Sequence, residues 1–286
     1  MWILLAIAAG TILVPYYLNT ARLMKKHDHR IGLFMMGALL FTLPFVVVML
    51  PKADTAMEWL VIGAGCIYGI SGIPFQISYR YVSPLIIAVS GEMVPVIAAL
   101  LGWIVLRERM SFGEVVAFVA ILAGSAFAAM SSGNKKTAAK GYFIILCACM
   151  FTATYQVLTK HGKNAAGFNG LELLMMHRTG VFLSNMMLLI TPLRRDMLEF
   201  FKLSNADKLG IALNNLMFIS FAVMFATAMA TQPQARNNGL IGAVYFGIVQ
   251  TGLFLHGALT GHESHITRKA LGASIAFAGL IWLAMQ

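Results

Sequence analysis

An acidic residue lies inside one of the most apolar stretches of the chain. Glu92 belongs to the run 86–95, IIAVSGEMVP. A carboxylate in an apolar environment is unfavourable unless it faces a cavity or a partner. Two interpretations are open. Glu92 binds a cationic group or a proton, or it lies near a helix end or an interface and caps or pairs structurally.

A proline follows Glu92 within one helical turn. Pro95 cannot donate a backbone hydrogen bond, so it predicts a kink or a hinge in this helix, with ordinary packing of a kink as the alternative. On a helix, positions 92, 96, 99 and 103 share a face. Glu92 and Trp103 are therefore expected on one stripe, together with Val96 and Ala99.

Uncharged polar and aromatic side chains recur in the other apolar runs. Aromatic faces beside a carboxylate suit an amine through cation–π contact, and Tyr and Gln side chains beside an acid suit a zwitterion such as an amino acid. Each side chain could instead only join helices, at roughly 0.6 kcal/mol per hydrogen bond. The candidate substrate or proton site comprises Glu92, Tyr68, Gln76, Tyr79, Trp103, Tyr155, Gln156, Asn214, Tyr245, Gln250 and His256.

One basic residue also falls inside an apolar run. Arg178 follows His177 and lies within a few turns of the start of its segment. We expect its long side chain to reach the headgroup region, and the alternative is that it binds an anion. Because no cluster of basic residues occurs inside the apolar runs, amines and amino acids are favoured over anions as ligands.

Motifs for catalysis or cofactor binding are weak or missing from the sequence. It has no Gly-rich phosphate loop, no Gly-x-Ser-x-Gly and no paired acids at catalytic spacing. The runs His27-Asp28-His29 and His262-Glu263-Ser264-His265 could ligate a metal, but they fit solvated loops better. We therefore expect no enzyme activity, no cofactor and no metal site.

The composition indicates which elements hold these residues. Of the 286 residues, 59% are hydrophobic and 11% are charged, against about 25% charged in a soluble domain. Such a chain cannot cover a water-exposed surface, and a membrane-spanning helix needs roughly 20 apolar residues. Ten apolar segments fit this length: 2–20, 31–50, 57–79, 84–106, 112–130, 141–159, 170–191, 208–231, 238–258 and 268–285.

The segments are expected to be helices. A spanning segment must satisfy its backbone polar groups internally or in a closed barrel, and barrel strands would alternate polar and apolar residues, which these runs do not. Small residues along the third segment predict close helix contact there: Gly63, Gly65, Gly69 and Gly72. The sequence therefore predicts an all-α polytopic membrane protein.

A weak internal repeat divides the chain. Glu108 and Gly124 are separated by sixteen residues, and so are Glu263 and Gly279. A shift of 155 residues relates the two pairs. Five segments fall in each half, and homologous halves with an odd number of spans must have opposite orientations. We predict two inverted five-helix repeats, at residues 1–133 and 134–286.

The region from Pro95 to Gly124 resembles a known family signature. It contains the proline, the pair Gly102-Trp103, the pair Glu108-Arg109 at the segment end, and Ala123-Gly124. These features resemble the EamA-like family of the drug/metabolite transporter superfamily.

The resemblance is thinner in the second half of the chain. Gln250 stands where the first half has Pro95, and Ala258 stands where it has Trp103. The first spans of the two units have Ala9-Gly10 and Met150-Phe151 where the family often has Trp-Gly. No substrate is therefore carried over from a better-known member.

The resemblance implies a fold and a function. It implies ten helices paired five and five, and a central cavity lined mainly by the first, third, fourth, sixth, eighth and ninth. It also implies a secondary transporter or exporter that moves an amino acid, an amine or a drug-like compound by alternating access. The alternatives are a carrier of nucleotide-sugar or lipid-linked cargo, and a membrane scaffold that transports nothing.

The charges bear on partners and location. The net charge of +10 fits short loops that meet anionic lipid headgroups better than a nucleic-acid site. We expect a multi-pass protein of a bacterial inner membrane, acting as a monomer or homodimer, with lipid and a small-molecule substrate as partners. The resemblance implies cytoplasmic termini, whereas most Lys and Arg residues lie in loops on the other side, which favours the reverse orientation.

Overall fold

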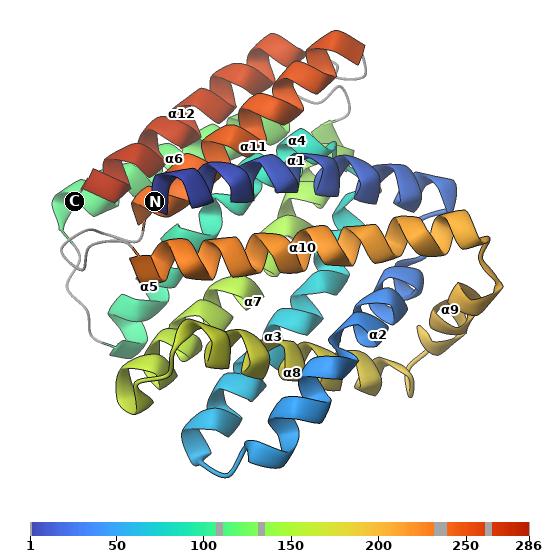
Figure 1. Cartoon of the computed structure of the whole chain (residues 1–286). Coiled ribbons are helices and arrows are strands. Elements are labelled where there is room, and N and C mark those ends of the chain that lie inside the picture. Colours follow the sequence, from blue (N-terminus) through green and yellow to red (C-terminus); the bar gives the residue numbers. More distant parts are fainter. Residues whose placement is uncertain (1, 107–110, 131–134, 232–238, 261–264, 286) are drawn as a thin grey trace.

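The helices form one bundle (Figure 1). The computed structural model describes residues 2–106, 111–130, 135–231, 239–260 and 265–285. In these ranges every regular element is helical, and two short 3₁₀ turns follow α2 and α9. The helices are α1 (Trp2–Lys26), α2 (Ile31–Met49), α3 (Ala56–Ser78), α4 (Pro84–Gly91), α5 (Met93–Leu106), α6 (Phe112–Met130), α7 (Lys135–Ala166), α8 (Gly170–Leu188), α9 (Arg194–Glu199), α10 (Asn205–Thr231), α11 (Gly239–Thr260) and α12 (Ile266–Met285).

The predicted all-α membrane fold is confirmed. Each of the ten predicted segments coincides with a helix, but the segment 84–106 is divided into α4 and α5. Within the described residues, eight helical segments are long and apolar enough to cross a membrane. α8 is not among them, and the searched part of α11, Val244–Thr260, is apolar but shorter, so the number of ten spans stays a prediction.

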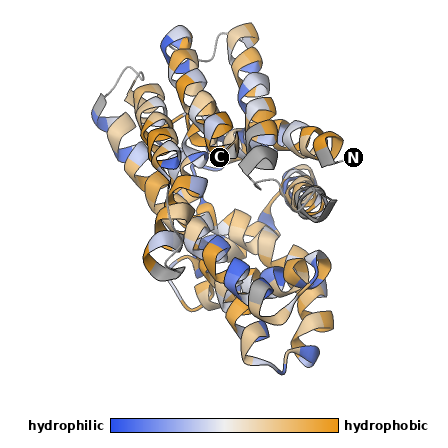
Figure 2. Cartoon of the chain, turned by 90° about the vertical axis from the view of Figure 1, so that its left-hand side faces the viewer, coloured by the Kyte–Doolittle hydropathy of each residue, from blue (hydrophilic) through white to orange (hydrophobic). Residues whose placement is uncertain are grey.

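The outward faces of the helices are apolar. Many large hydrophobic side chains are exposed, and Leu4, Phe112, Ile190 and Leu259 are more than two-thirds exposed. Figure 2 shows hydrophobic residues along most of the helices and several hydrophilic residues at helix ends. Exposure to water disfavours apolar surface by roughly 25 cal/mol per Å², so this surface suits lipid.

Two capping boxes fix the starts of α3 and α8. Thr55 accepts a hydrogen bond from the backbone of Glu58, whose carboxylate accepts in return from the backbone of Thr55. Asn169 and Glu172 make the same reciprocal pair at α8. Such a box satisfies the free N–H groups of the first turn. The two helices that carry Tyr68 and Arg178 therefore begin at defined residues.

The last helices of the two predicted halves, α6 and α12, pack closely. A side chain on Gly124 would place its Cβ 2.6 Å from the carbonyl oxygen of Gly272, and one on Gly279 would place it 2.9 Å from that of Ala117. The shift of 155 residues converts the first contact into the second. Glu108 and Glu263, the acidic members of the repeat, lie outside the described residues.

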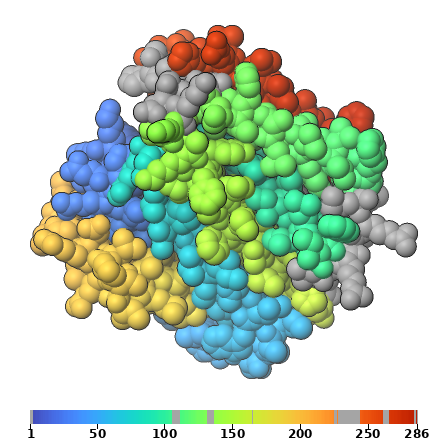
Figure 3. Space-filling model, turned by 180° about the vertical axis from the view of Figure 1, so that it is seen from behind, coloured from blue at the N-terminus to red at the C-terminus, as the bar shows by residue number. Residues whose placement is uncertain are grey.

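Contacts between other helix pairs are also related by exchanging the two predicted halves of the chain. The contact of α1 with α10 has its counterpart in the contact of α7 with α3, and the contact of α1 with α11 has its counterpart in that of α7 with α5. Seen from behind, α7 runs over the surface between α3 and α5 (Figure 3). This pairing is what two inverted five-helix units would give.

Two opposite edges of the bundle differ in the chain ends and basic residues that lie there. The beginning of α1 and the end of α12 lie at one edge (Figure 1). The end of α1, with Lys25 and Lys26, and α9, with Arg194 and Arg195, lie at the opposite edge. Lys26 forms an ion pair there with Asp207 of α10, with 2.6 Å between Nζ and Oδ1.

Candidate functional site

The site begins at the break between α4 and α5. Pro95 has no N–H to offer the carbonyl of Gly91 one turn earlier, so one helical hydrogen bond is missing in this turn. Accordingly α4 ends at Gly91 and α5 begins at Met93. The backbone N–H of Glu92 turns back to the carbonyl oxygen of Val89, at 3.3 Å. The predicted kink is therefore a discontinuity centred on Glu92.

Side chains from two other helices satisfy the end of α4. The hydroxyl of Ser125 on α6 donates to the carbonyl oxygen of Val89, at 3.2 Å, and the thiol of Cys149 on α7 donates to that of Ser90, at 3.4 Å. Free carbonyl groups at a buried helix end need such partners. Neither residue was predicted to belong to a site. From the sequence alone, Cys149 is expected to be a small packing residue.

Glu92 is fully buried, with 0% of its surface exposed. The side-chain amide of Gln250 on α11 donates a hydrogen bond to its Oε1, while Oε2 has no partner among the described residues. Gln250 is itself buried. Two residues of the predicted site, one from each half of the chain, thus meet in the interior.

Arg178 forms a second charged position, and its predicted location was wrong. Its side chain does not reach a membrane interface, because only 4% of its surface is exposed. In the described part of the chain its Nε and Nη2 atoms have no hydrogen-bond partner. The guanidinium carbon lies 5.0 Å from the centre of the Phe218 ring on α10.

The position of α8 explains why Arg178 is buried. This helix packs against α2, α3 and α10, so the face that carries His177 and Arg178 turns into the bundle. Two glycines permit the approach: a Cβ on Gly180 would lie 2.7 Å from the backbone nitrogen of Cys66, and one on Gly65 would lie 3.0 Å from the Cα of His177.

Aromatic rings surround Arg178. The ring of His177 lies 4.6 Å from that of Tyr68 and 4.5 Å from that of Tyr155, and the two tyrosine rings are 5.0 Å apart. The Phe218 ring stacks on Tyr68 at 6.2 Å. These rings come from α3, α7, α8 and α10. The structure therefore joins the predicted residues Tyr68 and Tyr155 around a charge that the prediction had placed elsewhere.

A row of rings continues from Arg178 towards Glu92. The ring centres are 5.9 Å apart between Phe218 and Phe221, 5.4 Å between Phe221 and Tyr245, and 4.2 Å between Tyr245 and Phe246. A Cβ on Gly91, the neighbour of Glu92, would lie 3.2 Å from the Phe246 ring. Tyr245, another predicted residue, thus lies between the two charged positions.

Further buried polar groups border this aromatic row. Gln76 and Tyr79 lie farther along α3, and the amide oxygen of the first and the hydroxyl of the second have no partner in the described residues. The Tyr79 ring contacts Phe75 at 5.7 Å, and Phe75 contacts Tyr17 at 6.0 Å. Their part in a substrate or proton site stays a prediction.

Asn214 has a structural environment. Its side-chain oxygen accepts a hydrogen bond from Asn19 at 2.9 Å, and its side-chain nitrogen donates to the hydroxyl of Thr20. Both partners are on α1, so Asn214 joins α10 to α1. Its hydrogen-bonding groups are engaged, and we do not place it in the proposed site.

Three other predicted residues lie away from the buried centre. Trp103 is 53% exposed on α5, and Gln156 is exposed on α7 beside the inward-facing Tyr155. His256 is partly buried, more than one turn beyond Gln250 on α11. Glu92 and Trp103 do not share one environment, because Glu92 is buried in the interior and Trp103 lies at the surface.

Sequence reasoning missed several interior residues. His177 and Phe218 contact the central rings, and Asn185 on α8 is buried with an unpartnered side-chain oxygen. The signal for His177 and Asn185 was their polarity within an apolar segment. Phe218 carried no signal, since a phenylalanine in a membrane helix is unremarkable in sequence.

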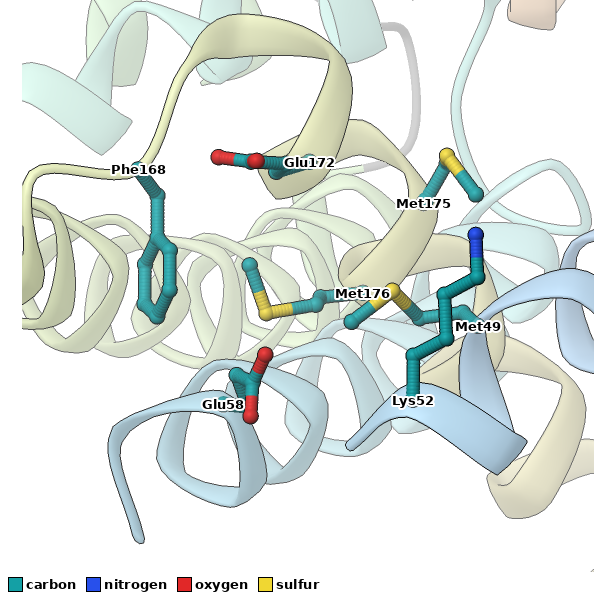
Figure 4. Close-up of a pocket in the computed structure, with 7 residues that line it drawn as sticks. All are labelled: Met49, Lys52, Glu58, Phe168, Glu172, Met175 and Met176. Atoms are coloured by element: carbon teal, nitrogen blue, oxygen red, sulfur yellow. The ribbon is translucent and has the colours of Figure 1, made fainter. Parts of the chain in front are cut away.

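Two pockets lie outside the aromatic centre. One of about 200 Å³ lies where α2, α3 and α8 meet (Figure 4). Its acids, Glu58 and Glu172, are those of the two capping boxes. The other, of about 210 Å³, lies between α4, α11 and α12 and has Gln250 and Ser274 in its wall. The partner of Glu92 therefore borders a hollow.

The comparison with known families finds a similarity in the first half of the chain. Residues 1–130 match the EamA-like transporter family. The EamA-like family is part of the drug/metabolite transporter superfamily, which the resemblance in sequence had implied. With the apolar helices, the match makes the chain an integral, multi-pass membrane protein.

The fold has a counterpart among solved structures. One crystal structure of another protein matches at a TM-score of 0.56, with 14% sequence identity, over 99% of this chain and 96% of the other. At this identity the likeness concerns the fold alone. This likeness in fold covers both halves of the chain. None of the curated proteins matches the chain.

Proposed function

We propose that the chain is a secondary transporter that moves a small metabolite by alternating access through the buried centre of the bundle. Its single strongest support is Glu92. This acid is fully buried at a helix break, with one oxygen bonded to Gln250 and the other open. Ionisable residues at membrane depth are unfavourable and commonly mark substrate or proton pathways.

The position of Glu92 suits coupling. Its hydrogen bond joins α4 and α5 of one predicted half to α11 of the other. A proton or a cationic group at the open oxygen changes the charge that Gln250 meets, and so changes how strongly the halves are held together. Discontinuous helices at the interface of inverted repeats form binding sites in several transporter folds.

The exchanged helix contacts support the two-unit arrangement. If residues 1–133 and 134–286 are inverted repeats, rocking of one unit against the other would open the centre to each side in turn. The close contact of α6 with α12 then serves as a fixed seam, because backbone atoms meet there.

A second candidate concerns the cargo. The sequence favoured amines and amino acids over anions because no cluster of basic residues occurs inside the apolar runs. The burial of Arg178 places a single cation in the interior and supports a substrate with one anionic group. An amino acid has an ammonium group for Glu92 and a carboxylate for Arg178. A carrier of anionic cargo remains the alternative.

The remaining properties of this proposal follow from the setting. We infer a bacterial inner-membrane protein without enzyme activity that works as a monomer or homodimer, with lipid and a small-molecule substrate as partners.

Uptake into liposomes tests the function. Liposomes with the purified protein are incubated with a metabolite extract, and the compounds retained inside are identified against empty liposomes. We expect at least one small metabolite to accumulate, and Glu92→Gln to lower its uptake by about tenfold or more and to alter its pH dependence. Glu199→Gln, at a partly exposed acid of α9 that pairs with Lys202, is the control. If no compound accumulates, the transport function fails, and if Glu92→Gln changes nothing, Glu92 has no such role.

A further inference from the structure

Arg178 is a cation that lacks an anion. It is 4% exposed, two of its guanidinium nitrogens are unpartnered, and within the described residues it meets no carboxylate. We infer that Arg178 binds a carboxylate group of the transported compound. This inference rests on the proposed function and names the substrate class: a small carboxylate with an apolar or aromatic body.

Arg178 differs from Glu92 in how its charge can be neutralised. A buried glutamate can take up a proton and become neutral. An arginine stays charged in proteins, and a buried charge without compensation is strongly unfavourable. The interior around Arg178 is therefore complete only when an anion is present.

The open atoms of Arg178 match a carboxylate in geometry. Nε and Nη2 form one edge of the guanidinium, and their N–H bonds point the same way. Two parallel N–H donors fit the two oxygens of a carboxylate. The face of the guanidinium is already used, because it lies over the Phe218 ring at 5.0 Å. The edge thus remains for a ligand.

The surroundings favour one negative charge and an apolar body. The tyrosine hydroxyls of Tyr16, Tyr68 and Tyr155 lie within electrostatic reach of the guanidinium, and in the described residues no second Arg or Lys joins this cluster. A phosphate with two charges would call for more cations. The rings of Tyr68, Tyr155 and Phe218 offer flat apolar surface for the rest of the molecule.

Binding to the wild-type protein tests the inference first. Purified full-length protein in detergent is titrated with 3-phenylpropionate, with its neutral isostere 3-phenylpropionamide, and with 2-phenylethyl phosphate. Calorimetry or the shift in thermal unfolding gives each Kd. Hydrogen bonds to a charged group are the strong ones, so we expect the carboxylate to bind at least about tenfold more tightly than the amide and more tightly than the phosphate.

Variants then assign the preference to Arg178. Arg178→Gln should bring the affinities for carboxylate and amide to within about twofold of each other, while Arg80→Gln should leave the preference unchanged. Arg80 is a fair control because it is exposed in the turn after α3 and bonds the carbonyl oxygen of His29. If Arg178→Gln does not fold, Arg178→Lys keeps the charge without the two parallel N–H donors. This variant should retain only part of the preference for the carboxylate.

Several results would overturn the inference. They are equal binding of carboxylate and amide to the wild type, tighter binding of the phosphate, no binding of any probe, or an intact preference in Arg178→Gln. These readings are independent of transport. A protein that binds the carboxylate but accumulates nothing in liposomes fails the proposed function, and one that transports without a carboxylate preference fails only this inference.

Discussion

Glu92 and Gln250 are 158 positions apart in the chain and share a hydrogen bond in the interior of the bundle. Glu92 lies at the break between α4 and α5, and Gln250 lies on α11, beside a hollow between α4, α11 and α12. The bond thus connects the most buried acid of the first half with a helix of the second. Whatever binds Glu92 acts on this connection.

The energetic link between the two residues can be measured. Gln250→Leu removes the donor and leaves a buried acid with no partner, which should lower the free energy of unfolding by about 1–3 kcal/mol. Glu92→Gln in the Gln250→Leu background should recover part of that loss, because an amide is less unfavourable in an apolar interior than a carboxylate.

Thermal unfolding of the four proteins in detergent completes a double-mutant cycle. Additive effects of the two substitutions would contradict a direct interaction. Gln156→Leu, at an exposed position of α7, controls for the loss of an amide and should change the midpoint little.

The helix break should matter for transport more than for stability. Pro95→Ala supplies the N–H that the Gly91 carbonyl lacks, so the helix can continue through Glu92 and re-aim its side chain. We expect a midpoint of unfolding equal to or above that of the wild type, with uptake lowered by about tenfold.

A second helix proline provides the control for Pro95→Ala. Pro44 is exposed within α2, away from the aromatic row. Pro44→Ala should leave uptake near the wild-type level. Equal uptake by wild type and Pro95→Ala would show that the discontinuity at Glu92 has no role in the transport cycle.

The sequence was sufficient for the helices and for the unusual acid. Long apolar runs admit few structures in lipid, so the segments agree with the observed helices. A single acid, Glu92, near Pro95 is conspicuous in such an apolar run. The capping residues Thr55 and Asn169 also act on residues close to them in the chain, at the starts of α3 and α8. These features depend on neighbours in the chain, which a sequence displays.

The arrangement around Arg178 could not be predicted in this way. Whether an arginine near a helix start reaches the interface or the interior depends on which face of α8 packs against α3, and that is set by Gly65 and Gly180, which are far apart in the chain. The hydrogen-bond partners of Asn214 could not be predicted for the same reason, since Asn19 and Thr20 lie on α1. The exposure of Trp103 depends on how α5 packs in the bundle, which periodicity alone does not give.

The contact between α3 and α8 should control the Arg178 position. Gly180→Ala puts a methyl group 2.7 Å from the backbone nitrogen of Cys66, so the helices must separate and shift Arg178 against Tyr68 and Phe218. We expect a loss of about 1–3 kcal/mol in the free energy of unfolding and a weaker preference for 3-phenylpropionate over its amide.

A matched glycine separates packing from helix propensity. Gly63 lies inside α3, the helix that Gly180 of α8 contacts, and a Cβ on Gly63 meets nothing within 4 Å. Alanine is favoured over glycine in a helix interior by roughly 1 kcal/mol, so Gly63→Ala should raise the midpoint of unfolding or leave it unchanged. Similar effects of the two substitutions would argue against close packing at Gly180.

Asn214 should behave as a structural residue. Asn214→Ala leaves the side chains of Asn19 and Thr20 without their partner inside the α1–α10 contact, which should lower the free energy of unfolding by about 1–3 kcal/mol. Because its polar atoms are already engaged, the Kd for 3-phenylpropionate should stay within about twofold of the wild-type value at a temperature where both proteins are folded. Thermal unfolding and titration of the same sample measure both quantities. A large loss of affinity with unchanged stability would instead return Asn214 to the binding site, where the sequence had placed it.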